Sequence, residues 1–215
     1  MTSRTAQLQV ARRRARRERA ARRRRQAFLL LGFLAAVSFG ALLLRPLFTS
    51  AVHDLTALPL RHENAIRAQA QDKRLDPSLI AGVIYAESKF SDSTSSAGAL
   101  GLMQLLPSTA HFIAGRSGGT AFTTEDLSTP DINIAYGSWY LRYLLDRYDD
   151  DEVLALAAYN GGMGNVDRWV AEAGARGERL DVADIPFPET RAYVGRVLDA
   201  RRDYRRSYAD ELGLR

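Results

Sequence analysis

The chain has 215 residues, of which 46% are hydrophobic and 26% charged, a length that suits one well-buried domain with an appended segment. Residues 1–25 hold eleven of the thirty Lys and Arg residues and a single acid, Glu18. The other residues carry 19 basic and 24 acidic side chains, so the high isoelectric point is no evidence for a nucleic-acid-binding domain, and we expect no nucleic-acid partner. The absence of cysteine excludes disulfides and thiolate chemistry.

A charge-free apolar segment of 18 residues, 27–44, follows the Arg-rich tail, residues 1–26, and ends before Arg45. Its length is close to the roughly 20 residues that cross the hydrocarbon core of a bilayer. We interpret it as a single transmembrane anchor, and the positive-inside rule then predicts a cytoplasmic tail and an exported remainder. A cleaved signal peptide is the alternative, although the basic region is long and no clear small-x-small site precedes Arg45.

Residues 45–60 contain two prolines and no clear period, which is typical of a connector. Fully extended, such a connector spans at most roughly 50 Å, so we expect the domain that follows to work near the membrane.

The exported residues read as mainly α, with no alternating strand of any length and no internal repeat. An amphipathic helix is predicted for residues 62–75, and Asp76 is a candidate N-cap for a second helix with Pro77 at its first position. Further helices are predicted in four places, residues 131–148, 151–160, 166–173 and 189–208.

The helix that starts at Pro77 carries one carboxylate on its apolar face. Ile80, Val83, Ile84 and Glu87 follow the i, i+3, i+4, i+7 spacing that places side chains on one side of a helix. A carboxylate among aliphatic side chains is partly desolvated, which raises its pKa. The alternative is that Glu87 lies near the helix end, turned into water or paired with a basic residue such as Lys89.

Four segments resemble, in order and approximate spacing, the signature motifs of the soluble lytic transglycosylase family, which has the goose-lysozyme-like SLT domain. They are the Glu–Ser pair at 87–88, "GLMQLLPSTA" from Gly101, "AYNGGMGNV" from Ala158 and "PETRAYV" from Pro188. The resemblance implies a lysozyme-like helical domain at 61–206, with 207–215 as a C-terminal tail. It also implies cleavage of peptidoglycan glycan strands between N-acetylmuramic acid and N-acetylglucosamine. With the predicted anchor, we expect an enzyme of the bacterial cytoplasmic membrane whose domain lies in the periplasm or another extracytoplasmic space. A partner in cell-wall or secretion machinery is compatible with it.

Carried over by position, Glu87 resembles the single catalytic acid and base of the family. The resemblance implies a hydrogen bond from the Tyr159 hydroxyl to this carboxyl and a groove floor made by the Met103 thioether. The residues that match substrate-binding positions are Ser96, Met103, Gln104, Tyr159 and Asn160, and those that match supporting positions are Ser88, Gly98, Gly101, Glu189 and Tyr193.

The implied reaction needs one protein carboxylate, no metal and no cofactor. Ordinary glycosidases use two carboxylates, whereas the motif segments offer Glu87 and only Glu189 besides it. In the family mechanism the muramoyl sixth-carbon hydroxyl attacks the anomeric carbon and closes a 1,6-anhydro ring. Two alternatives remain, a hydrolytic muramidase that uses water and a non-catalytic glycan-binding module of a wall-spanning assembly.

Other polar and aromatic residues have plainer interpretations. The acidic run that ends at Asp151 lacks the ligand spacing of an EF-hand and is expected to be a solvated loop with a helix N-cap. Trp139 and Trp169 can stack on sugars, but core packing is the stronger expectation at helical spacing.

Overall fold

A computed structural model of the protein describes residues 58–119 and 121–214. The expected tail, the expected anchor at 27–44 and most of the connector lie outside these residues. Within the described part, no helix combines the length and the apolar character that a membrane span requires.

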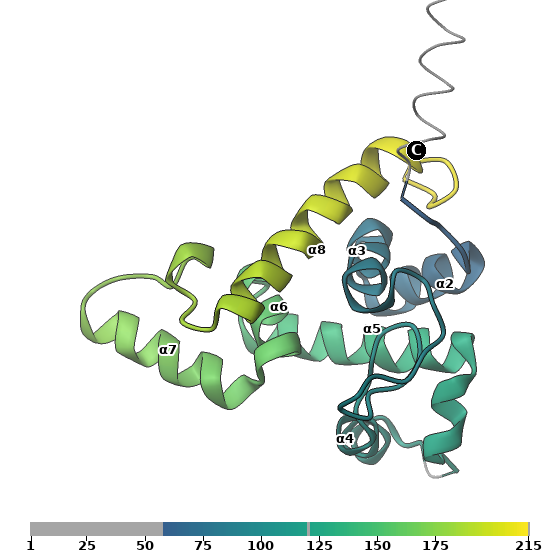
Figure 1. Ribbon diagram of the computed structural model, residues 1–215, viewed down its shortest axis with the longest axis horizontal. Coiled ribbons are helices and arrows are strands. Elements are labelled where there is room, and N and C mark those ends of the chain that lie inside the picture. The colour runs from purple at the N-terminus through teal and green to yellow at the C-terminus, as the bar shows by residue number, and fades with distance from the viewer. Residues whose placement is uncertain (1–57, 120, 215) are drawn as a thin grey trace, which may run out of the picture. The chain divides into compact units, whose positions relative to one another are not determined.

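The described residues form a helical domain, as the sequence predicts (Figure 1). Isolated β-bridges join Thr94 to Leu100 and Leu100 to Leu105, and no longer strand pairing occurs in this part. The helices are α2 (Glu63–Lys73), α3 (Pro77–Ser88), α4 (Pro107–Ser117), η1 (Thr124–Ser128), α5 (Pro130–Arg147), α6 (Glu152–Gly161), α7 (Met163–Ala175), η2 (Val182–Asp184) and α8 (Pro188–Ser207).

Helix α3 begins as the sequence predicts. The Asp76 side chain accepts a hydrogen bond from the Ser78 amide at 2.9 Å, and Pro77 occupies the first turn. The Asp76 carboxylate also pairs with Arg201 at 3.0 Å and with Arg205 at 2.6 Å. Since both arginines belong to α8, the cap of one helix also joins α3 to the last helix.

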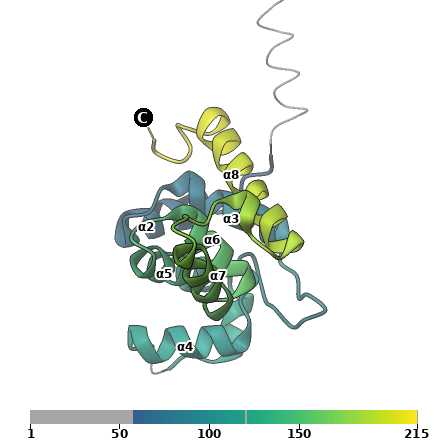
Figure 2. The ribbon, with the colours of Figure 1, turned by 90° about the vertical axis from the view of Figure 1, so that its left-hand side faces the viewer.

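Helices α3 and α8 cross in close contact at Gly82. A Cβ atom at this position would lie 2.9 Å from the Val197 carbonyl oxygen and 3.2 Å from the Arg201 amide nitrogen. Glycine therefore allows the two backbones to approach. Figures 1 and 2 both show α8 passing over α3, with α5 and α6 below the pair.

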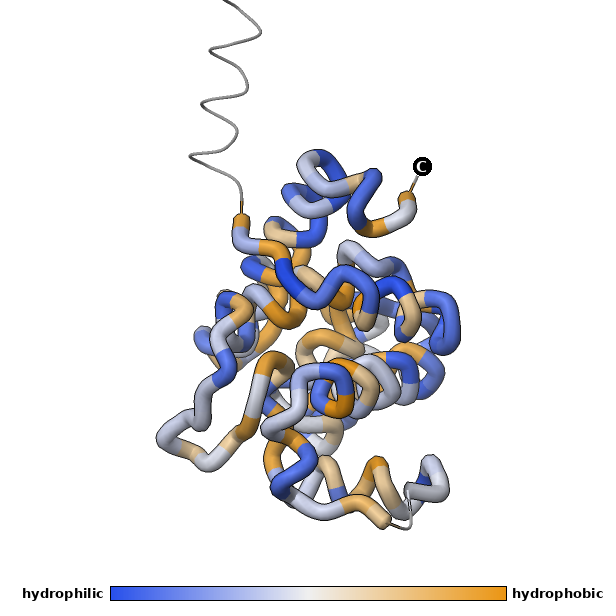
Figure 3. Tube along the Cα trace, turned by 90° about the vertical axis from the view of Figure 1, so that its right-hand side faces the viewer, coloured by the Kyte–Doolittle hydropathy of each residue, from blue (hydrophilic) through white to orange (hydrophobic). Residues whose placement is uncertain are grey.

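The core is built from the apolar faces of these helices, and Figure 3 shows the hydrophobic stretches gathered in the middle of the domain. Ile80, Val83 and Ile84 are fully buried, in agreement with the predicted face of α3. Trp169 is a core residue, as its helical spacing indicated, and its ring meets that of Phe187 edge to face at 4.9 Å. Asp151 caps α6 by accepting from the Val153 amide at 3.0 Å.

The structure extends the domain beyond both expected boundaries, residues 61 and 206. The hydroxyls of Tyr204 and Tyr208 donate to the carbonyls of Pro59 and Leu58, at 2.5 and 2.6 Å. At the other end, Leu212 is buried in the core. The expected connector and C-terminal tail therefore each contribute packed residues, because short apolar stretches outside a periodic helix give little sequence signal.

Candidate active site

A cavity of about 390 Å³ lies where α3, α5, α6 and the start of α8 meet the segment between α3 and α4. Six of the residues singled out in the sequence line it, and they come from four separate stretches of the chain. The full lining comprises Glu87, Ser95, Ser96, Ala97, Ala99, Gln104, Leu105, Leu106, Thr109, Tyr140, Tyr159, Asn160 and Glu189.

Glu87 occupies the last turn of α3 and projects into this cavity. Burial raises the pKa of its carboxyl from 4.5 to about 7, and the neighbouring Tyr193 hydroxyl and Arg196 charge offset only part of that rise. A carboxyl with this pKa is substantially protonated near neutral pH, as a general acid must be. Lys89 is exposed and forms no ion pair with Glu87 among the described residues, so the alternative of a paired carboxylate is not realised.

Two tyrosines, the half-buried Tyr159 and the fully buried Tyr193, stand beside Glu87, and their roles differ from the expectation. The Tyr159 hydroxyl donates to the Met103 carbonyl oxygen at 2.9 Å instead of to the Glu87 carboxyl. The Tyr193 hydroxyl also lies near the carboxyl and lowers the pKa of Glu87. The Tyr193 hydroxyl is buried and makes no hydrogen bond of ordinary geometry in the described structure. Burial raises the pKa of both phenols, and the Glu87 carboxylate raises it further, because an ionised phenol beside it would be repelled.

Met103 does not form the floor of the cavity. Its side chain is fully buried, and a Cβ atom at Gly137 would lie 2.3 Å from the Met103 sulfur. The thioether therefore packs on the glycine of α5, below the cavity lining. The sequence gives no sign of this packing, because Gly137 is 34 positions away along the chain.

The segment between Thr94 and Leu105 is held in shape by its own polar groups. Gln104 lines the cavity with a positive φ of 47° and donates from Nε2 to the carbonyls of Ser93 at 2.8 Å and Gly101 at 2.7 Å. Its amide nitrogen is therefore occupied within the protein, whereas its carbonyl oxygen remains a candidate acceptor for a ligand. Ser88 supports the same segment by donating to the Leu102 carbonyl at 2.8 Å.

Asn133 of α5 is a supporting residue that the sequence analysis missed. Its side chain is fully buried, and its oxygen accepts from the Met103 amide at 2.8 Å. Its nitrogen donates to the carbonyls of Leu100 at 2.9 Å and Leu127 at 3.0 Å. All its hydrogen-bonding capacity except one acceptor lone pair is thus used to fix the cavity segment. An asparagine on the apolar face of the predicted helix was the available signal.

The opposite wall comes from α6 and α8. The Asn160 side-chain oxygen accepts from the Thr190 hydroxyl at 2.8 Å, which joins the end of α6 to the start of α8. Glu189, the residue before Thr190, is exposed and lines the cavity. No group of three or more His, Cys, Asp or Glu side chains in the described residues is arranged to hold a metal ion.

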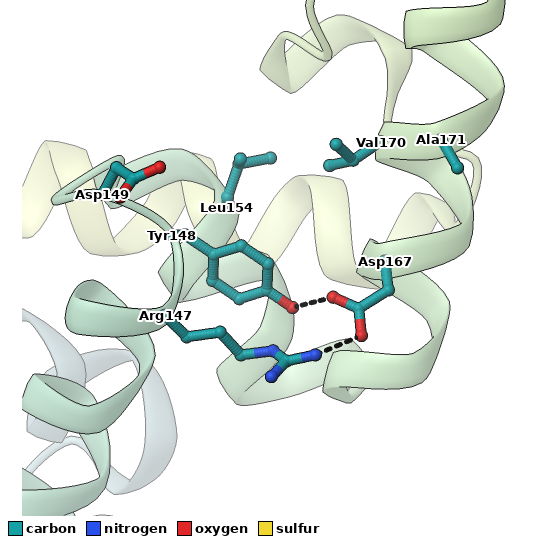
Figure 4. Close-up of a pocket in the computed structure, with 7 residues that line it drawn as sticks. All are labelled: Arg147, Tyr148, Asp149, Leu154, Asp167, Val170 and Ala171. Atoms are coloured by element: carbon teal, nitrogen blue, oxygen red, sulfur yellow. Dashed lines mark hydrogen bonds and ion pairs between the residues drawn. The ribbon is translucent and has the colours of Figure 1, made fainter.

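A second cavity, of about 520 Å³, lies at the far end of α6 and is a poorer candidate (Figure 4). Its polar groups are paired with one another, because Asp167 accepts from Arg147 at 2.6 Å and from the Tyr148 hydroxyl at 3.0 Å. These bonds join α5 to α7. The cavity lacks a strongly perturbed carboxyl such as Glu87, so we place the site in the smaller one.

Comparisons with known proteins identify the family of the chain. The transglycosylase SLT domain family matches residues 64–182. The soluble lytic murein transglycosylase of Escherichia coli K12 is 31% identical over 156 residues, which are 71% of this chain and 24% of that protein. Membrane-bound lytic murein transglycosylase D of the same organism is 29% identical over 152 residues, 69% of this chain and 32% of that protein.

A solved structure shows the same fold. An inactive glutamate-to-glutamine mutant of the lytic transglycosylase Slt from Pseudomonas aeruginosa matches with a TM-score of 0.63 and 34% identity, over 69% of this chain and 24% of that one. The chain thus spans about a quarter to a third of the length of these relatives. Because the family match covers more than half of its residues, the chain belongs to the transglycosylase SLT domain family.

Proposed function

We propose that this chain is a lytic transglycosylase that cleaves the β-1,4 bond between N-acetylmuramic acid and N-acetylglucosamine in peptidoglycan and leaves 1,6-anhydro ends. The observation that carries the proposal is Glu87, a desolvated carboxyl with a pKa of about 7 in a cavity lined by hydrogen-bonding groups. Membership of the family supports it, as does the inactivity of the Pseudomonas aeruginosa relative in its glutamate-to-glutamine form.

In the proposed reaction Glu87 first acts as an acid. The protonated carboxyl gives its proton to the glycosidic oxygen as the bond to the anomeric carbon breaks. The resulting carboxylate then takes a proton from the sixth-carbon hydroxyl of the muramoyl sugar, and that oxygen attacks the anomeric carbon. The proton balance on Glu87 closes within one cycle, and no water is consumed.

Muropeptide analysis tests this proposal. We would digest purified peptidoglycan with the full chain and with Glu87→Gln, and identify the released ends by mass spectrometry. We expect anhydro ends from the unchanged chain and none from the variant. Reducing ends would instead show a hydrolytic muramidase, a reaction for which the cavity offers a second carboxylate in Glu189. Binding without release by either protein would show a glycan-binding module.

We also propose that residues 27–44 anchor the domain in the bacterial cytoplasmic membrane, with the Arg-rich tail inside and the domain outside. The support is the 18-residue charge-free segment behind a strongly basic tail. The anchor would keep the cavity near newly made glycan strands and within reach of cell-wall or secretion machinery.

Membrane fractionation followed by sequencing of the N-terminus tests the anchor. An uncleaved anchor predicts that the chain stays in the membrane pellet after alkaline carbonate extraction and retains residues 1–26. A sequence that starts after residue 44 would show a cleaved signal peptide instead, and extraction of a chain that retains residues 1–26 would overturn the anchor.

A further inference from the structure

The candidate cavity continues as a row of side chains along α4 and α5. Thr109 of α4 and Tyr140 of α5 both line the cavity. Phe112 and Tyr143 each follow one of these residues by three positions, which places them on the same helix faces, one turn further along. The rings of Phe112 and Tyr143 meet edge to face at 5.3 Å, so the two helices bring them together just beyond the cavity.

Trp139 completes an aromatic platform with these two rings. Its ring lies parallel to that of Tyr143, with 5.6 Å between centroids and 6° between planes. Phe112, Trp139 and Tyr143, which we name the aromatic platform, are all half-buried at the edge of the core. Half-buried aromatic rings at the end of a polar cavity suit sugar rings, which offer apolar C–H faces for stacking.

Arg116 adds one positive charge to the platform. Its guanidinium carbon lies 4.9 Å from the Phe112 ring centroid and 5.5 Å from that of Tyr143, within cation–π range. The side chain is exposed, and it forms no ion pair with any residue that the structure describes. An arginine held by two rings and left without an acid is prepared to bind a carboxylate from a ligand.

We propose that the aromatic platform and Arg116 form a glycan subsite beyond the cavity, with sugar rings on the platform and a carboxylate of the lactyl or stem-peptide group on Arg116. The inference rests on the proposed function. A glycan strand is a polymer, so sugars next to the reacting bond must lie on the surface that continues the cavity. The cavity itself, about 390 Å³, is at the small end of the ligand-site range of roughly 300–1,000 Å³.

Tryptophan fluorescence tests the subsite, because Trp139 and Trp169 are the two tryptophans of the chain. The full chain, purified in detergent with Glu87→Gln to prevent cleavage, would be titrated with a disaccharide, with chitohexaose and with uncrosslinked glycan strands that bear stem peptides. We expect the longer ligands to change the emission and to bind about tenfold tighter than the disaccharide. Trp139→Phe should abolish the emission change, since Trp169 lies in the core under α7 and α8.

Two further variants separate stacking from charge recognition. Tyr143→Leu should weaken both longer ligands about tenfold. Arg116→Gln should weaken the peptide-bearing strands about fivefold and leave chitohexaose, which has no carboxylate, within twofold. Arg168→Gln, on an exposed arginine of α7, is the matched control and should change neither.

The outcomes distinguish the subsite from the function. An emission change that persists in Trp139→Phe, or equal affinity for short and long ligands, would overturn the subsite and leave the proposed function intact. Equal weakening of both longer ligands by Arg116→Gln would overturn carboxylate recognition. If the parent protein binds none of the glycans, the proposed function fails together with the subsite.

Discussion

The Tyr159 hydroxyl donates a hydrogen bond of 2.9 Å to the main-chain carbonyl oxygen of Met103. This bond joins α6 to the segment that follows Glu87, across 56 residues of sequence. Burial of the phenol raises the pKa of Tyr159, and the charge of the neighbouring Glu87 carboxyl raises it further. The tyrosine therefore remains a neutral donor, and it holds the segment around Met103 in place beside the candidate acid.

Replacement of Tyr159 by phenylalanine should affect stability and turnover together. The change removes the hydroxyl donor, so the Met103 carbonyl oxygen loses this hydrogen bond. The loss should lower the free energy of unfolding by about 1–3 kcal/mol. Because the cavity segment loosens, we expect the rate of muropeptide release to fall as well. Urea unfolding and a turnover assay at one temperature provide the two measurements.

Tyr148→Phe is the matched control for that prediction. Its hydroxyl donates to Asp167 at 3.0 Å in the second cavity, so its loss should also lower stability, by about 1 kcal/mol. It lies away from Glu87, and turnover should be unchanged. A Tyr159→Phe protein that loses stability but retains full turnover would show that the bond has no role in the site.

The raised pKa of Glu87 makes both activity and stability depend on pH. The proposed acid step needs the protonated carboxyl, so activity should be lost as the pH rises through about 7. The native carboxyl has a pKa of about 7 against 4.5 in the unfolded chain, so between these values the unfolded state binds fewer protons than the native state. The free energy of unfolding should therefore fall over this window, by up to about 3 kcal/mol, and this contribution is fully present only below pH 4.5.

Glu87→Gln tests the stability part of that prediction without any assay of activity. The amide cannot ionise, so the variant should be more stable than the parent at pH 8, by up to about 3 kcal/mol, and equally stable at pH 4. Denaturation curves of both proteins at pH 8 and at pH 4 measure this difference, and the pair of curves at pH 4 serves as the control. If the difference between the proteins is the same at both pH values, Glu87 is not desolvated in the native state.

Most of the helices, though not α4, were predictable from the sequence because their periodicity and caps are local. Asp76 and Pro77 start α3 as expected, and the face that carries Glu87 is buried up to that residue. The contacts that shape the site were not predictable, because they join distant positions. Asn133 holds the segment around Met103 across 30 residues, and neither residue type signals the pairing. Resemblance identified Met103 and Tyr159, but only the structure places the Met103 side chain below the cavity.

Two glycines of the cavity segment should respond differently to alanine. Gly98 and Gly101 both have positive φ, 78° and 71°, so each substitution adds backbone strain of roughly 1 kcal/mol. At Gly101 the added Cβ would also lie 2.2 Å from the Asn133 side-chain nitrogen, whereas at Gly98 nothing lies within 4 Å. We expect Gly101→Ala to cost several times more, about 3–5 kcal/mol, because it also breaks the Asn133 bonds. Equal losses in thermal unfolding would contradict the close approach.

The crossing of α3 and α8 offers a prediction that connects packing to the site. Glu87 belongs to α3 and Tyr193 to α8, and the two helices approach through Gly82 between them. Gly82→Ala places a methyl group 2.9 Å from the Val197 carbonyl oxygen, so the helices must separate. This overpacking should cost about 1–3 kcal/mol, and the greater hydration of Glu87 should lower its pKa. The upper limit of the pH–activity profile should then move to lower pH.

Gly195→Ala is the control, because it lies on α8 where no atom is within 4 Å of the added Cβ. Here alanine should stabilise the helix by about 0.5–1 kcal/mol, and the profile should stay in place. Both variants replace glycine by alanine within a helix. Comparison of the two therefore separates a general effect of helix propensity from a specific effect of the distance between α3 and α8. A profile that stays fixed in Gly82→Ala, despite a loss of stability, would show that the distance between α3 and α8 does not set the acidity of Glu87.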